Sequence, residues 1–196
     1  MRLFLIRHGE TDSNVNHLLD TAVPGAPLNE NGRQQAESLV ERLKDVPFTG
    51  IYASTLIRAQ QTAEPLAAGH GLEVQVIAGI QEIAAGVEEM NADWTHYVGV
   101  LETWSPDNLD VGVEGGETAR EFLTRYSEAM RKIEADGHEV AALVSHGAAM
   151  RVMGLFLDTS LDMQRAPALL NTEWIELEGS SDEGWRVRQW GSRSFK

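Results

Sequence analysis

The chain has 196 residues, 42% of them hydrophobic, no cysteine and a formal net charge of −14 at pH 7. This length and apolar content predict a single domain over residues 1–196, and the lack of cysteine excludes disulfides and thiol chemistry. No apolar run approaches the roughly 20 residues that span a bilayer, and no signal-peptide pattern is present, so we expect a cytoplasmic protein without membrane partners. The acidic charge argues against nucleic acid, whose phosphates an acidic surface repels, but a local arginine cluster can still hold a small anion.

In the first half of the chain, apolar runs alternate with amphipathic stretches. Strands are predicted at residues 3–6 and 50–54, and alternation over residues 72–77 predicts a half-exposed edge strand. A helix is predicted between the first two strands, where apolar residues recur at helical spacing at Ala36, Leu39, Val40 and Leu43. A second helix begins at about Thr55, and Pro65 is expected to kink or restart it.

The second half continues this alternation of strands and helices. Amphipathic helices are predicted around residues 94–101 and 117–133. A buried strand follows at residues 139–145, with a helix after it to about Leu157, and two strand-like runs lie in the tail at residues 174–177 and 185–190. Strands that alternate with helices predict an α/β fold with a largely parallel sheet.

Basic side chains follow the predicted strands at their carboxyl ends. Arg7 and His8 come directly after the first strand, and His146 follows a later one. Arg58 lies about one helical turn beyond the strand that ends at Ser54. Since open α/β sheets bind ligands beyond the carboxyl ends of their strands, we expect these side chains to converge. Four cationic or titratable groups at one place predict an anion site, and a tetrahedral phosphate fits best.

A series of segments carries a family resemblance. In chain order they are RHGET with Asn14, PLNENGRQQA, YASTLIRAQQTA, QEIAAG, GGE and VSHG. Together they cover most of residues 3–150 and resemble the signature of the histidine phosphatase superfamily, in its phosphoglycerate mutase-like branch and of the broad-specificity phosphatase type. The resemblance implies a three-layer α/β/α fold with a mostly parallel central sheet, and a covering segment at about residues 84–114.

The resemblance also implies a reaction, the metal-independent hydrolysis of small phosphomonoesters through a phosphohistidine intermediate. His8 would attack phosphorus while a backbone carbonyl or the Gly9 turn holds its other N–H. Glu82 would protonate the leaving alkoxide and then accept a proton from water. The remaining catalytic and phosphate-binding residues that the motifs imply are Arg7, Asn14, Arg58, His146 and Gly147. No metal and no cofactor is expected, because protein cations take the place of a metal.

The chain departs from the family pattern beside the expected site. Gly25 stands where the family usually carries Asp, and Asn29 where Thr is common. After Glu82, the family usually carries acidic and aromatic residues, whereas this chain carries AAG and then EEM. We expect the wall beside the acid to be altered by Ala84, Ala85, Glu88 and Met90.

Two other functions stay open at this point, a cofactor-dependent phosphoglycerate mutase and a non-catalytic module that binds phospho-ligands. No Lys or Arg lies between Gly86 and Gly116, which counts against a doubly anionic substrate and favours the phosphatase. Retention of the expected nucleophile counts against a module that only binds. The oligomeric state is open, with a homodimer as one alternative. Three aromatic residues are expected either in the core of a covering helix or on a substrate platform, namely Trp94, Tyr97 and Trp104.

Overall fold

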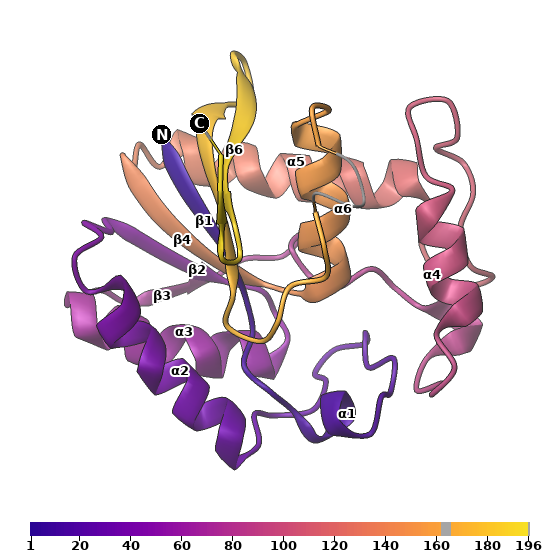
Figure 1. Ribbon diagram of the computed structural model, residues 1–196, viewed down its shortest axis with the longest axis horizontal. Helices are drawn as coiled ribbons and strands as arrows, with labels where there is room; N and C mark the ends of the chain where they lie inside the picture. Colours follow the sequence, from indigo (N-terminus) through magenta and orange to yellow (C-terminus); the bar gives the residue numbers. More distant parts are fainter. Residues whose placement is uncertain (162–165, 196) are drawn as a thin grey trace.

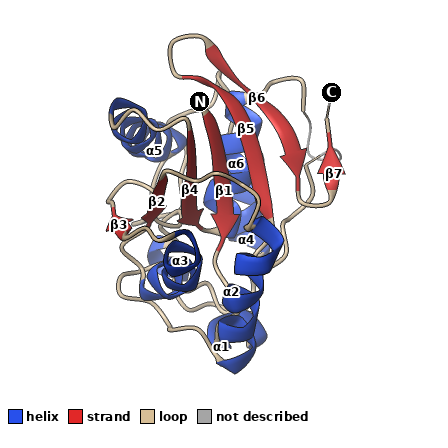
Figure 2. Cartoon of the chain, turned by 90° about the vertical axis from the view of Figure 1, so that its left-hand side faces the viewer, coloured by secondary structure: helices blue, strands red, loops and turns tan. Residues whose placement is uncertain are grey.

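The computed structural model describes residues 1–161 and 166–195, and its strands form one seven-stranded sheet in the order β3-β2-β4-β1-β5-β6-β7 (Figures 1 and 2). The strands are β1 (Arg2–Arg7), β2 (Gly50–Ala53), β3 (Val74–Val76), β4 (Val140–Ser145), β5 (Trp174–Ser180), β6 (Gly184–Trp190) and β7 (Arg193–Ser194). The first four pair in parallel, and β5 to β7 continue the sheet antiparallel on one side. The predicted sheet with a mostly parallel centre is therefore confirmed.

Helices cover both faces of the sheet and make three layers (Figure 2). One face carries α2 (Glu30–Leu43) and α3 (Ile57–His70), and the other carries α5 (Ala119–Ala135) and α6 (Gly147–Leu157). Alternate residues of β1 serve the two sides of the core. Leu3 and Leu5 pack with buried residues of α5 and α6, whereas Phe4 and Ile6 pack with those of α2 and α3. The continuous apolar run of β1 therefore reflects burial on both faces.

The helix α3 differs from the sequence expectation at Pro65. It runs without interruption from Ile57 to His70, so the expected restart of the helix is wrong. Residues on both sides of the proline are buried where α3 packs on the sheet and on α2, among them Ala63, Leu66 and Ala67. This burial outweighs the hydrogen bond that a proline nitrogen does not make.

The segment between β3 and α5 holds a short 3₁₀ turn, η1 (Gly86–Glu88), and the helix α4 (Thr95–Glu102). Figure 1 shows α4 at the edge of the molecule, beyond α6, and shows α1 (Asp12–Val15) at the end of the sheet where β1 finishes. These peripheral elements surround the carboxyl ends of the parallel strands. Within the described ranges, no helix is long and apolar enough to span a bilayer.

Candidate active site

Strand register brings the expected site residues together at the carboxyl ends of β1, β2 and β4. Arg7 pairs with Ser145 across β1 and β4, so the next residues, His8 and His146, leave the sheet side by side. Their ring centroids lie 5.2 Å apart. Ala53 pairs with Val144 in the same way, which places Ser54 beside this pair.

Two hydrogen bonds fix the tautomer of His8. Its Nδ1 lies 2.6 Å from the carbonyl oxygen of Gly9, and a carbonyl only accepts, so Nδ1 carries the hydrogen. The Arg58 Nε–H points at the other ring nitrogen, Nε2, over 3.1 Å. The lone pair of a neutral imidazole therefore lies on Nε2, beside a guanidinium group. The Gly9 turn holds the second N–H, as predicted.

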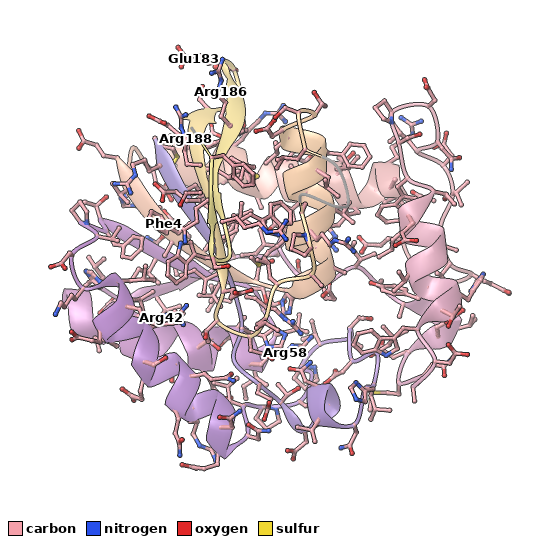
Figure 3. The ribbon with its side chains drawn as sticks, viewed as in Figure 1. Phe4, Arg42, Arg58, Glu183, Arg186 and Arg188 are labelled. Atoms are coloured by element: carbon pink, nitrogen blue, oxygen red, sulfur yellow. The ribbon has the colours of Figure 1, made fainter. Side chains whose placement is uncertain are left out.

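Arg58 is buried and is held by a residue that the sequence analysis missed. The carbonyl oxygen of Asp20 accepts a hydrogen bond from Arg58 Nη2 at 2.6 Å, and the Asp20 carboxylate lies 3.6 Å from Nη1. Figure 3 shows Arg58 near the end of the sheet that carries α1. Gly25 lies against the same guanidinium, with φ +72°, and a Cβ there would lie 2.3 Å from Nη1. Gly25 thus gives Arg58 room, and Asp20 provides a neighbouring carboxylate.

Arg7 lies on the other side of His8 and reaches the segment before β5. Its Nη1 donates to the carbonyl oxygen of Leu169 at 2.5 Å. Gly147, the first residue of α6, packs against the guanidinium, since a Cβ at this position would lie 3.2 Å from Arg7 Nε. A glycine therefore lets the start of α6 approach the arginine closely.

His146 is fully buried and hydrogen-bonds to the end of β2. Its Nε2 lies 2.6 Å from the hydroxyl oxygen of Ser54, which also accepts the Leu56 N–H at 3.3 Å. The sequence marked Ser54 only as a strand end, and its contact with His146 depends on the β2–β4 register.

Glu82 lies at the amino end of α6. Its two carboxylate oxygens accept the backbone N–H groups of Ala148 at 3.1 Å and Ala149 at 2.8 Å, and the N–H of Ile83 at 2.9 Å. Glu82 shares one cavity lining with Arg7, His8 and Arg58, so the predicted acid is brought to the predicted nucleophile.

A half-buried ion pair supports the loop that carries Glu82. Arg125 of α5 donates to the carbonyl oxygens of Gly79, Gln81 and Glu82 at 2.7, 3.1 and 3.0 Å. The same guanidinium binds both carboxylate oxygens of Glu117, the last residue of the GGE motif. The motif therefore has a structural role, because a bidentate pair fixes the direction of the arginine.

Asn14 lies in the cavity lining and meets a residue from the tail, Asn171. The Asn171 amide donates to the carbonyl oxygen of His8 at 2.9 Å and to Asn14 Oδ1 at 3.2 Å. No motif marked Asn171. Asn171 precedes β5 in the chain. The antiparallel pairing of β5 with β1 brings this part of the tail to the carboxyl end of β1.

Burial and the neighbouring charges of Arg58 and Arg7 hold the pKa of His8 well below its usual value. Burial is also the main reason that the pKa of His146 is well lowered, with Arg58 and His8 adding to the effect. Both imidazoles are therefore neutral in the folded protein at neutral pH.

We expect acid to destabilise the protein through these two histidines. Below about pH 6.5, both imidazoles bind protons in the unfolded chain but not in the folded one. The free energy of unfolding therefore decreases as the pH is lowered. The expected slope is up to about 1.4 kcal/mol per pH unit for each histidine. Urea unfolding at pH 7.5, 6.5 and 5.5 measures the free energy of unfolding at each pH. In His146→Gln, this free energy should change less with pH than in the wild type. Parallel slopes would contradict this account.

A cavity of about 620 Å³ has Arg7, His8, Arg58 and Glu82 in its lining. Its lining includes Trp94, Tyr97 and Trp104, of which Tyr97 and Trp104 also belong to the buried core. Tyr97 and Trp104 therefore confirm the core interpretation, whereas the substrate platform stays a prediction.

The expectation for the wall beside the acid is wrong. The lining residues do not include Ala84, Ala85, Glu88 or Met90. Backbone groups of this segment instead brace the loop after α1. The Ala85 N–H donates to the Thr21 hydroxyl at 3.0 Å, and the Met90 N–H donates to the Leu19 carbonyl at 2.8 Å.

Comparison with known proteins agrees with this fold. The model of the histidine phosphatase superfamily (branch 1) matches residues 3–193. The chain belongs to this superfamily, which confirms the resemblance drawn from its motifs.

Several curated relatives match the chain. An adenosylcobalamin/alpha-ribazole phosphatase of Salmonella typhimurium is 32% identical over 69% of this chain and 68% of its own length. A probable phosphoglycerate mutase GpmB of Proteus mirabilis is 32% identical over 83% of this chain and 76% of its own length. A PE-PGRS family protein of Mycobacterium tuberculosis, PE_PGRS11, is 31% identical over 94% of this chain, which spans 35% of that protein.

Among solved structures, a mycobacterial glucosyl-3-phosphoglycerate phosphatase in complex with VO3 superimposes with a TM-score of 0.82. The two chains are 24% identical, and the match covers 98% of this chain and 99% of the other. This likeness confirms the three-layer α/β/α fold class.

Proposed function

We propose that the protein hydrolyses small phosphomonoesters through a covalent phosphohistidine on His8. One observation carries the proposal: a buried, neutral imidazole whose Nε2 lone pair is held in place by Gly9 and Arg58. Arg7 lines the cavity on the same side. A lone pair beside two guanidinium groups is suited to attack phosphorus, because the cations offset the charge of the phosphoryl oxygens.

The reaction proceeds in two displacements. In the first, Nε2 of His8 bonds to phosphorus, the P–O ester bond breaks, and the leaving oxygen takes a proton from protonated Glu82. In the second, water attacks the phosphorus, Glu82 accepts a proton from that water, and the P–N bond breaks. Inorganic phosphate leaves, and both side chains return to their initial states.

Three buried nitrogen atoms support phosphoryl binding at this place. Arg7 Nε, Arg58 Nη1 and His146 Nδ1 make no hydrogen bond to any residue in the described part of the chain. The other ring nitrogen of His146, Nε2, lies 2.6 Å from the Ser54 hydroxyl oxygen. Buried donors are rarely left without partners, and the oxygens of a transferring phosphoryl group are strong acceptors.

The relative named adenosylcobalamin/alpha-ribazole phosphatase supports the same reaction class. The relative named as a probable phosphoglycerate mutase keeps a second candidate open. Product analysis separates the two: 3-phosphoglycerate with a trace of 2,3-bisphosphoglycerate yields inorganic phosphate with a phosphatase and 2-phosphoglycerate with a mutase. We expect free phosphate in assays with EDTA throughout, since protein cations supply the charge stabilisation.

Replacement Glu82→Gln tests the proton transfers. With p-nitrophenyl phosphate, whose leaving group needs no protonation, we expect a burst of nitrophenol equal to the enzyme concentration, followed by slow turnover. The burst arises because attack of water loses its base. With an alkyl phosphate, both steps lose proton transfer, and we expect kcat to fall about 10²- to 10⁴-fold without a burst.

The matched control is Glu114→Gln, a change at an exposed glutamate in the segment between β3 and α5. It should leave both rates unchanged. If Glu82→Gln showed no burst with p-nitrophenyl phosphate and kept wild-type kcat on the alkyl phosphate, Glu82 would have no part in the proton transfers.

A further inference from the structure

The cavity beside the catalytic cluster extends between α4 and α6, which lie next to each other in Figure 1. From α6, Val152, Leu155 and Phe156 line it, and from α4, Val98 and Leu101. Residues three and four apart on each helix share one face, so the two helices turn apolar stripes toward the same space. Trp94 and Trp104, just before and after α4, add aromatic surface.

The charges in the lining are unevenly distributed. Arg7 and Arg58 lie at the catalytic end, and Arg151 is the one further cation among the described lining residues. Glu102 lines the same part of the cavity, and its negative charge acts on Arg151. Arg151 Nε also donates to the carbonyl oxygen of Ala166 at 2.9 Å. Among the described lining residues, the part of the cavity away from His8 thus has no net positive charge and mostly apolar walls.

From this division we infer that the α4–α6 cavity binds the ester group of the substrate and selects phosphomonoesters with an uncharged aryl or alkyl group. This inference rests on the proposed function, since it assigns the phosphoryl group to the catalytic end. A volume of about 620 Å³ lies within the roughly 300–1,000 Å³ of pockets that bury small molecules. An apolar group gains affinity by leaving water, whereas a second anion would lose its hydration without meeting an excess of cations.

A binding series tests the inference without requiring turnover. Methyl-, butyl- and octylphosphonate are titrated calorimetrically into the wild-type protein, with 3-phosphonopropionate as the probe that carries a second anion. We expect affinity to rise at least about a hundredfold from methyl to octyl, since each buried methylene contributes up to about fourfold. The carboxylate of 3-phosphonopropionate should give no gain in affinity over methylphosphonate. Equal affinities along the alkyl series, or tightest binding of 3-phosphonopropionate, would overturn the inference.

Two variants locate the effect in the cavity. Phe156→Ala should lower kcat/KM for 1-naphthyl phosphate at least about tenfold relative to methyl phosphate, because it removes apolar contact with the larger group. Val98→Lys should lower kcat/KM for 1-naphthyl phosphate and raise it for 3-phosphoglycerate. The matched control is Val87→Lys, the same change at a side chain 69% exposed to solvent and outside the lining.

The outcomes separate this inference from the proposed function. Substrate ratios that are the same in Phe156→Ala, Val98→Lys and the wild type would refute the cavity's role while hydrolysis still supports the phosphatase. Rising affinity along the phosphonate series without any hydrolysis would refute the proposed function and keep the apolar site.

Discussion

Replacement His8→Asn should abolish phosphomonoester hydrolysis, with kcat lowered by at least about 10⁴-fold. Asn retains a polar side chain of similar reach but has no basic nitrogen to attack phosphorus. Burst measurements with p-nitrophenyl phosphate should show no burst, and protein exposed to labelled substrate and quenched in alkaline detergent, where phosphohistidine is stable, should carry no phosphoryl group. The wild type, and more strongly Glu82→Gln, should carry label on His8, because phosphohistidine is the intermediate that water must resolve.

The control for this experiment is His17→Asn. His17 is exposed and has φ +54°, a left-handed conformation that Asn tolerates better than most residues. It should retain wild-type turnover. Hydrolysis that persists in His8→Asn would refute the covalent route, whereas phosphonate binding without hydrolysis in the wild type would leave the non-catalytic module as the better account.

Replacement Arg58→Gln should lower kcat/KM about 10²- to 10³-fold and move the acid limb of its pH profile to higher pH. The rate falls because a donor to the phosphoryl oxygens is lost. The limb moves because Arg58 is the main neighbouring charge that lowers the pKa of His8, and the reactive form is neutral His8. When that pKa rises toward its ordinary value, a larger share of the enzyme is protonated and inactive just below neutral pH.

Arg58→Lys separates charge from geometry. It retains a positive charge near His8 but not the planar group that contacts His8 and Asp20, so we expect a rate loss with a smaller shift of the acid limb. The matched control is Arg188→Gln, because Arg188 pairs with Glu178 at the opposite end of the molecule in Figure 3. An acid limb at the same pH in wild type and Arg58→Gln would contradict the electrostatic argument.

Residues adjacent in sequence explain why most of the candidate site was predictable. Arg7 and His8 stand directly after an apolar run, and His146 stands directly after another. Since parallel strands align their carboxyl ends, residue type and position next to a strand were enough to predict a shared anion site. The tautomer of His8 depends on the next peptide group, at Gly9, and was also predictable.

Partners distant in sequence were not predictable in this way. Asp20 reaches Arg58 through a loop whose conformation no periodic pattern describes, and Arg125 reaches the Glu82 loop from the middle of α5. Pro65 misled the prediction because the propensity of one residue was weighed without the packing of α3 on the sheet.

The sequence by itself determined the fold class and the cationic residues, because hydrophobic period and residues next to strand ends are local properties of the chain. Its motifs determined the superfamily by their resemblance to the family pattern. Only the tertiary structure decided what surrounds them. The return of β5 along β1 brings Asn171 to His8, and the meeting of α4 with α6 forms the apolar cavity. Each depends on how separate elements pack, since a side chain's partners are set by strand register and loop path and not by its own neighbours in sequence.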